Sequence, residues 1–276
     1  DLRALPTFTV DGENARDFDD AVSLAVGQNG QMTLYVSIAD VGHYVKLGSA
    51  LDSEALRRGT SIYFPDYVLP MLPIQLSNDI CSLNPGVDRL AITAELTYDR
   101  TGKLLEYRFF PSLIHSHRQL TYTIVRKILI DRDERERKRH QKLVPTLEAM
   151  HTLYGLLEKN RKERGGLEFD FPEPQVIIDL RGGVEGIIKA ERNVAHMIIE
   201  EFMVAANAAA AQFLVKHRRN PLFRVHPRPD PRSAAEIRRL IHNLGYPVRK
   251  ERPVDSRTYQ HFLNATQGKP EERLIH

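Results

Sequence analysis

The feature that most constrains this chain is a cluster of acidic residues near its beginning. The stretch from Thr9 to Val22 places four aspartates within ten residues: Asp11, Asp17, Asp19 and Asp20. Gly12 interrupts any helical pattern, so the stretch is predicted to be a loop that runs into a strand over residues 21–26. Carboxylates gathered so closely repel one another, and a fold has little reason to collect them unless a cation lies between them.

The ligand atoms of this cluster are all oxygens, because no His or Cys lies nearby in the sequence. Hard oxygen ligands favour Mg²⁺ or Mn²⁺ over zinc. In an extended chain Asp17 and Asp19 point to one side and Asp20 points to the other. One ion, or two ions about 4 Å apart, could then be held, with Asp11 returning from the far side of the turn. The alternative is a solvated acidic turn, because acidic runs are usually exposed loops.

Charge is distributed unevenly along the chain, although the net charge is only +3. Residues 1–125 carry 10 basic and 15 acidic side chains, whereas residues 216–252 carry 11 basic and 3 acidic ones. An acidic region that gathers metal beside a basic region that gathers phosphates suits a metal-dependent enzyme acting on a polyanion. A chance surface can have the same pattern, so this observation is weak on its own.

Other features of the composition restrict the class of protein. The 276 residues, 42% of them hydrophobic, are enough for one large domain or two small ones. A single cysteine, Cys81, excludes an internal disulfide and suits a reducing compartment, so a cytoplasmic location is expected. No signal peptide opens the chain and no apolar run approaches the ~20 residues needed to span a bilayer, so no membrane association is expected.

Hydrophobic periodicity predicts both strands and helices. Alternation predicts two antiparallel hairpins in the first half, over 20–26 with 32–41 and over 89–99 with 104–115. A further hairpin is expected over 175–180 with 184–189. Helices are expected over 49–58, 193–217 and 232–245, and Thr121 is expected to cap another. The last 30 residues carry no recognisable motif.

Three segments leave their role open. Three prolines in residues 61–73 exclude a regular helix and present Tyr63, which either stacks on a base or packs in the core. Glu201 falls within the apolar stripe of the 193–217 helix, so it either has a basic partner or lines a site. Residues 131–140 are expected to form an exposed segment of mixed charge, which does not indicate an RNA site by composition.

The stretch from Thr9 to Val22 closely resembles the signature of the ribonuclease II / ribonuclease R family, in its catalytic RNB domain. It departs from the commonest form chiefly at Asn14, where many members carry an acid. The resemblance continues through Pro70–Pro85 and Gly166–Glu173 and covers essentially the whole chain. It implies an α+β fold, with mixed or antiparallel sheets surrounded by helices. It also implies that residues 1–276 are an RNB domain, incomplete at its C-terminal end, with cold-shock and S1 modules outside this chain.

The resemblance further implies a monomeric enzyme that hydrolyses single-stranded RNA processively from the 3′ end to nucleoside 5′-monophosphates. Mg²⁺, with Mn²⁺ as a possibility, would be held by Asp11, Asp17 and Asp20, and Asp19 would complete the cluster. The implied RNA contacts include two stacking rings on opposite sides of the bases and a tyrosine at the 3′ end. In this sequence the implied RNA-binding positions are Tyr63, Tyr122, Phe169, Glu201, Arg224 and His226.

The resemblance has one departure, and two other classes of function stay open beside it. Family members carry a later arginine in an S-P-I-R stretch and a further glutamate, and neither lies in these 276 residues. The chain alone is therefore expected to bind RNA weakly and to turn over little or not at all. The first alternative is a phosphotransferase with a D-x-D nucleophile, but that motif needs a strand leading into its first aspartate. The second is a catalytically inactive RNA-binding homologue.

Overall fold

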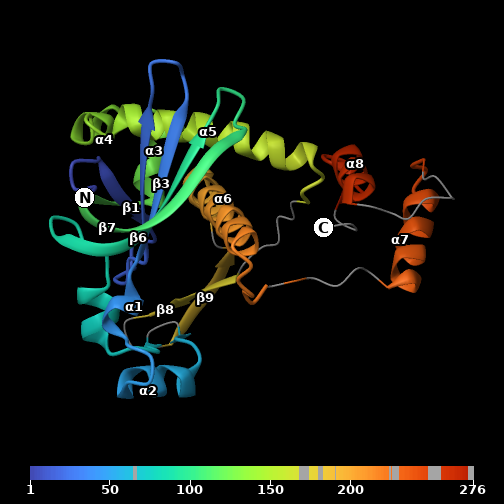
Figure 1. Cartoon of the computed structure of the whole chain (residues 1–276). Coiled ribbons are helices and arrows are strands. Elements are labelled where there is room, and N and C mark those ends of the chain that lie inside the picture. Colours follow the sequence, from blue (N-terminus) through green and yellow to red (C-terminus); the bar gives the residue numbers. More distant parts are fainter. Residues whose placement is uncertain are drawn as a thin grey trace.

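The centre of the molecule is a closed five-stranded barrel (Figure 1). The computed structural model describes residues 1–64, 67–167, 174–179, 183–189, 191–223, 225, 230–247 and 256–272. The barrel strands are β1 (Thr7–Asp11), β2 (Asp20–Val26), β3 (Met32–Ala39), β6 (Asp88–Tyr98) and β7 (Leu104–Thr121). Neighbouring strands are antiparallel except β1 and β7, which run parallel and close the barrel. The predicted α+β class with a mixed sheet is confirmed.

Both hairpins predicted in the first half are present, and the second one explains how the barrel closes. In β3, Met32, Leu34 and Val36 are buried at alternate positions, as the sequence pattern required. The turn between β6 and β7 holds Gly102 at a φ of 76°, and a Cβ there would lie 2.7 Å from Leu156 Cβ. β7 continues to Thr121, beyond its predicted end, because its last residues leave β6 and pair with β1.

Three helices cover one side of the barrel: α3 (Tyr122–Leu129), α5 (Val144–Glu163) and α6 (Val194–Lys216) (Figure 1). The predicted cap of α3 is confirmed, because the Thr121 side chain accepts a hydrogen bond from the Ile124 N–H. The short helix α4 (Glu134–Arg139) connects α3 to α5. The apolar faces of α3, α5 and α6 and the barrel interior form one core. Its fully buried side chains include Phe8, Leu34, Leu96, Leu120, Ile128, Leu147, Leu153 and Phe202.

A second, smaller core lies where the chain leaves the barrel after β3. The elements in this region are α1 (Val41–Tyr44), α2 (Ala50–Arg58), the two-residue strands β4 (Ile62–Tyr63) and β5 (Val68–Leu69), and the π-helix η1 (Gln75–Ile80). Phe18 and Leu83 pack together in this core with Leu76. The described part of the proline-rich segment 61–73 contains no regular helix, as predicted.

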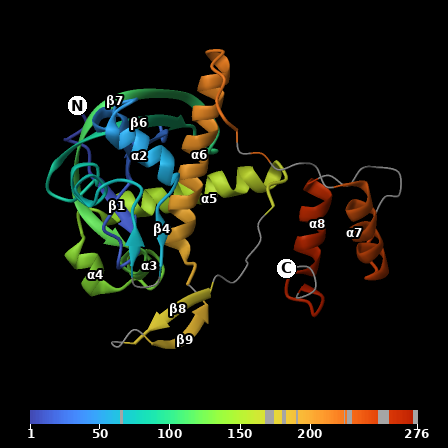
Figure 2. The same ribbon diagram turned by 90° about the horizontal axis from the view of Figure 1, so that it is seen from below.

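The second half of the chain adds elements outside the barrel. The hairpin of β8 (Pro174–Ile178) and β9 (Val184–Lys189), and the helices α7 (Pro231–Asn243) and α8 (Ser256–Thr266), stand apart from it in both views (Figures 1 and 2). α8 was not predicted from the sequence. The Gln260 side chain donates a hydrogen bond to the Gly166 carbonyl at 3.2 Å, which ties α8 to the chain just beyond α5.

The length and composition of α6 differ from the expectation that no segment is long and apolar enough to span a bilayer. Of the described helices, it alone is long and apolar enough to do so by length and composition. Such evidence is weak, because a core helix of a globular protein meets the same criterion. In this structure Ala195, Ile198 and Phe202 of α6 pack in the main core, against the barrel and its other covering helices.

Phe202 provides a test of this packing. Its side chain is 0% exposed, so Phe202→Ala is expected to lower the free energy of unfolding by about 3–5 kcal/mol through lost burial and a residual cavity. Val204→Ala on the same helix is the control, because Val204 is 47% exposed, and a change within about 0.5 kcal/mol is expected. Urea unfolding of both variants measures the difference. Equal effects would contradict the packing of α6 described above.

Candidate functional site

The four predicted aspartates gather at one end of the barrel. Asp11 ends β1, Asp20 begins β2, and Asp17 and Asp19 lie in the connection between these strands. Strand pairing places Asp11 opposite Thr121 of β7 and Asp20 opposite Ile38 of β3. The two carboxylates carried by strands are thus supported by the barrel, while the other two depend on how the connection is anchored.

The connection is anchored by the segment that follows η1. The backbone N–H of Phe18 donates to the Ser82 hydroxyl at 2.9 Å, and that hydroxyl donates to the Arg16 carbonyl at 3.2 Å. The Leu83 N–H donates to the Phe18 carbonyl at 2.9 Å. Phe18 is buried, and alternation of side chains in extended chain then leaves its neighbours Asp17 and Asp19 on the opposite side.

Arg89 on β6 holds this anchoring segment in place. Its Nε donates to the Ser82 carbonyl at 2.9 Å, and one terminal nitrogen donates to both the carbonyl and the carboxylate of Asp79 at 3.0 Å. The sequence analysis missed Ser82 and Arg89 as positioning residues. Ser82 lies within the Pro70–Pro85 stretch of the resemblance, but its role depends on Phe18 and Arg16, which are 64 and 66 residues away in the sequence. Arg89 lies seven residues from Ser82, and no sequence pattern connected the two.

Burial and mutual repulsion alter the acidity of the cluster. Burial raises the pKa of Asp11 to about 6 against an opposing effect of the Thr9 side chain, and the nearby charges of Asp20, Asp17 and Asp19 add to the rise. Burial, followed by the charge of Asp19, raises the pKa of Asp20 to about 6. The pKa of Asp19 is also raised, by burial and by Asp17. A bound cation would offset both causes, because it stabilises the ionised carboxylates.

The donor set fits a divalent cation, although the carboxylates do not form a preformed cage. In the described part of the chain, no three His, Cys, Asp or Glu side chains are arranged to hold one ion together. However, Asp11 Oδ2 is buried and has no hydrogen-bond partner among the described residues, so this oxygen lacks the compensation that a buried carboxylate needs. Repulsion keeps carboxylates apart in the absence of a cation, and a bound cation would attract these oxygens.

Two of the predicted aromatic residues lie at the cluster. The Tyr63 hydroxyl donates to Asp17 Oδ2 at 2.9 Å, while the residue is 65% exposed. Tyr122 begins α3 and directly follows Thr121, which pairs with Asp11. Burial, followed by the charges of Asp11 and Asp20, raises the pKa of Tyr122. The structure therefore brings both tyrosines to the four aspartates.

The ring of Tyr122 rests on a residue that the sequence analysis did not identify. His196 of α6 stacks on it with ring centroids 3.7 Å apart and an interplanar angle of 19°. Burial lowers the pKa of His196, so the neutral ring is favoured in this contact. His196 also closes the capping box of α6, because its Nδ1 accepts from the Asn193 N–H. The first turn of α6 thus fixes His196, which packs against the ring of Tyr122.

The remaining predicted residues lie elsewhere or outside the described part of the chain. Glu201 is 7% exposed on α6 and forms an ion pair with Arg161 of α5 at 2.8 Å. This confirms that Glu201 has a basic partner, while its contact with RNA stays a prediction. Phe169, Arg224 and His226 lie outside the described residues.

Comparison with known proteins gives consistent matches over the whole chain. The family model described as RNB domain matches residues 1–276. Ribonuclease R of Escherichia coli (strain K12) is 42% identical over 275 residues, which cover 100% of this chain and 34% of that protein. The solved structure of Mycoplasma genitalium RNase R in complex with ribose methylated single-stranded RNA has a TM-score of 0.90 at 31% identity. The match covers 99% of this chain and 42% of that one.

A more distant structure shows the fold alone. Yeast Ssd1, described as a pseudonuclease, has a TM-score of 0.70 at 16% identity, over 95% of this chain and 33% of that one. The chain spans about a third of the length of the curated ribonuclease R of E. coli that it matches.

The raised pKa of Asp20 predicts a pH-dependent stability. The native state binds more protons than the unfolded state between the ordinary pKa of 3.8 and about 6. Stability from protonated Asp20 is therefore present at low pH and is lost as the pH rises through about 6. Asp20→Asn removes the buried charge, so we expect it to stabilise the metal-free protein at pH 8. The gain should be about 1–2 kcal/mol smaller at pH 5.

Urea unfolding in EDTA at the two pH values measures this difference. Glu106→Gln, an exposed substitution on β7, is the control for removal of a negative charge. A gain for Asp20→Asn that does not change between pH 5 and pH 8 would contradict the burial of this carboxyl.

Proposed function

This chain belongs to the RNB domain family, and we propose that it is the catalytic part of an exoribonuclease that hydrolyses single-stranded RNA. We propose processive 3′→5′ action that releases nucleoside 5′-monophosphates. The observation that carries this proposal is the gathering of four carboxylates and two tyrosines at one end of the barrel. Similarity to proteins named ribonuclease R over the full length of this chain supports it.

The carboxylates are the proposed ligands of a divalent cation, Mg²⁺ or Mn²⁺. When bound, such an ion polarises the scissile phosphate, lowers the pKa of a water molecule and neutralises the leaving oxygen. Asp11, Asp17 and Asp20 would hold it, and Asp19 would complete the cluster. The buried, unpartnered Oδ2 of Asp11 supports this assignment, because a metal ligand would end its isolation.

The two tyrosines would position the substrate. Tyr63 offers an exposed ring for stacking on a base, which contributes about 1–3 kcal/mol without regard to sequence. Its hydroxyl is bonded to Asp17, so a stacked base would lie next to the carboxylates. Tyr122 is braced by His196 and carries a hydroxyl near Asp11 and Asp20, where it would donate a hydrogen bond to the terminal nucleotide.

No observation favours the alternatives more strongly. An inactive RNA-binding homologue is possible on this fold, but all four aspartates are present here. A D-x-D phosphotransferase is disfavoured, because β2 begins after Asp17 and Asp19 instead of leading into them. We further propose that the protein is a monomer located in the cytoplasm, because a single cysteine suits a reducing compartment.

Asp19→Asn tests the catalytic assignment. These 276 residues would replace the matching segment of E. coli ribonuclease R, and single-turnover hydrolysis of a labelled oligonucleotide would be measured in Mg²⁺. We expect the rate to fall by about a hundredfold or more, since a charge that serves the metal is lost. Binding of the same RNA in EDTA should stay within about twofold.

Glu106→Gln in the same chimera is the matched control and should leave both quantities unchanged. Unaltered hydrolysis by Asp19→Asn would contradict the catalytic assignment. A parallel loss of RNA binding would instead indicate a structural role for Asp19.

Tyr63 allows the ring and the hydroxyl to be tested separately. Tyr63→Ala removes the stacking face, so we expect a longer or more heterogeneous limit product in the same chimera. Tyr63→Phe keeps the ring and loses only the hydrogen bond to Asp17, so the limit product should keep its length. Gel analysis of complete digests measures this. An unchanged limit product for Tyr63→Ala would remove Tyr63 from the stacking role.

A further inference from the structure

A second charged site lies near the opposite end of β1 from the aspartate cluster. It is a cavity of about 450 Å³, and the basic side chains that line it are His117, Arg118, Lys138, Arg139, His140 and Lys142. Strand register pairs Phe8 with Arg118 and Asp11 with Thr121, so the cavity begins about three residues, roughly 10 Å, from Asp11 along the strands. No carboxylate lines the cavity.

The four permanent cations of this cavity are not neutralised by the protein. Within the described ranges, neither Arg118 nor Arg139 forms an ion pair or a side-chain hydrogen bond, and the same holds for Lys138 and Lys142. In contrast, Arg137, which lies on α4 with Lys138 and Arg139, forms an ion pair with Glu148 at 3.0 Å. Arg132 and Arg137 thus pair with Glu148 of α5, whereas Lys138 and Arg139 line the cavity without an ion pair among the described residues.

A buried histidine adds a polar group to the wall of the cavity. The His140 side chain is 8% exposed, and its Nε2 has no hydrogen-bond partner among the described residues. Glu136 lies 3.6 Å away and its Oε2 is equally unpartnered. Burial lowers the pKa of His140, Glu136 opposes this shift, and Arg139 and Arg118 add to it. Nε2 lies against the Glu136 carboxylate oxygen, so His140 lines the cavity without offering that nitrogen to an anion.

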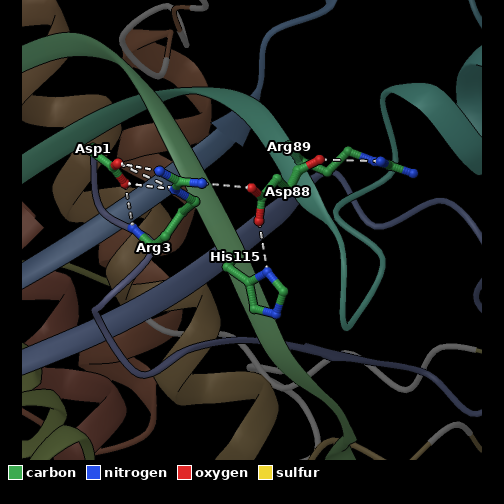
Figure 3. A network of polar contacts seen from close by, with 5 residues as sticks. All are labelled: Asp1, Arg3, Asp88, Arg89 and His115. Carbon is green, nitrogen blue, oxygen red and sulfur yellow. Dashed lines mark hydrogen bonds and ion pairs between the residues drawn. The ribbon is translucent and has the colours of Figure 1, made fainter.

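Two acidic groups that are linked to the cavity through His115 and His117, Asp1 and Asp88, are already engaged in ion pairs. Figure 3 shows Arg3 between Asp1 and Asp88, with the ring of His115 bonded to the other oxygen of Asp88. His115 in turn contacts His117 of the cavity, with ring centroids 5.3 Å apart. The hydrogen bond from His115, then the one from Arg3, lowers the pKa of Asp88, so its charge is already used within this network.

We propose that this cavity is a phosphate-binding site, separate from the aspartate cluster, that takes the phosphate group of a nucleotide or of an RNA strand. Two guanidinium groups and two ammonium groups suit phosphate oxygens, because charge-assisted hydrogen bonds to phosphate are short and strong. The volume lies within the range of about 300–1,000 Å³ typical of small-molecule sites, so it admits more than a bare ion. This site requires no metal and none of the residues proposed for catalysis.

The test uses calorimetric titration of the 276-residue chain in EDTA at constant ionic strength, which prevents the carboxylates from recruiting phosphate through a cation. The probes are inorganic phosphate, a nucleoside 5′-monophosphate and a short single-stranded RNA. The double variant Arg118→Gln/Arg139→Gln is expected to weaken binding of the effective probe by about tenfold or more, because two charge-assisted contacts are lost. A shift of the His140 ring resonances on titration of the unsubstituted chain reports occupancy of the cavity itself.

Arg135→Gln is the matched control. Arg135 is an exposed cation on the same helix that does not line the cavity, and its loss should change affinity by about twofold at most. Thermal unfolding of both variants establishes that they fold.

The three probes identify the source of the phosphate. Binding of phosphate or the mononucleotide, weakened by the double variant, supports a site for a free phosphate ligand. Binding of RNA alone, weakened in the same way, supports a site for the strand outside the cleavage centre. No binding of any probe, or equal affinities of the double variant and Arg135→Gln, would overturn the proposal. Because the aspartates are intact and no metal is present, these outcomes do not depend on whether the chain is a nuclease.

Discussion

The site depends on holding four mutually repelling carboxylates at one end of a barrel. Two are carried by strands, Asp11 on β1 and Asp20 on β2, so the ladder of backbone hydrogen bonds opposes their separation. The other two flank Phe18, whose burial and backbone contacts with Ser82 secure the connection. The pKa values of about 6 for Asp11 and Asp20 show that burial and repulsion destabilise their ionised forms in the absence of a cation.

The parallel pair of β1 and β7 links this acidic end to the rest of the molecule. At its far end β7 continues into α3, so Tyr122 reaches the carboxylates directly from the strand that closes the barrel. Near its beginning the same pair borders the cavity of Arg118 and Arg139. A short piece of sheet therefore separates a region that attracts cations from a region that attracts anions. A polyanionic substrate would respond to both regions.

Local patterns predicted much of the fold. The β2–β3 hairpin, the cap at Thr121 and the helix beginning after Asn193 depend on neighbouring residues, and each was recognised from them. Failures occurred where partners are distant in sequence. β7 extends beyond its predicted end because β1 pairs with it. A basic partner was one of the two possibilities predicted for Glu201, but only folding identifies it as Arg161 of another helix. α8 has no strong sequence signal, and the structure ties it to Gly166 beyond α5.

By itself the sequence determined which ligand type the cluster offers: four aspartates supply only oxygen ligands, which favour a hard divalent cation, and the surrounding motif indicates the family. The tertiary structure alone decided which groups assist them. Tyr63 is bonded to Asp17, and His196 stacks on Tyr122. Folding also brings β7, α4 and the residues after α4 together around the separate basic cavity. The physical reason is that ligand type belongs to each side chain, whereas contact, burial and the resulting pKa belong to neighbours that only folding brings together.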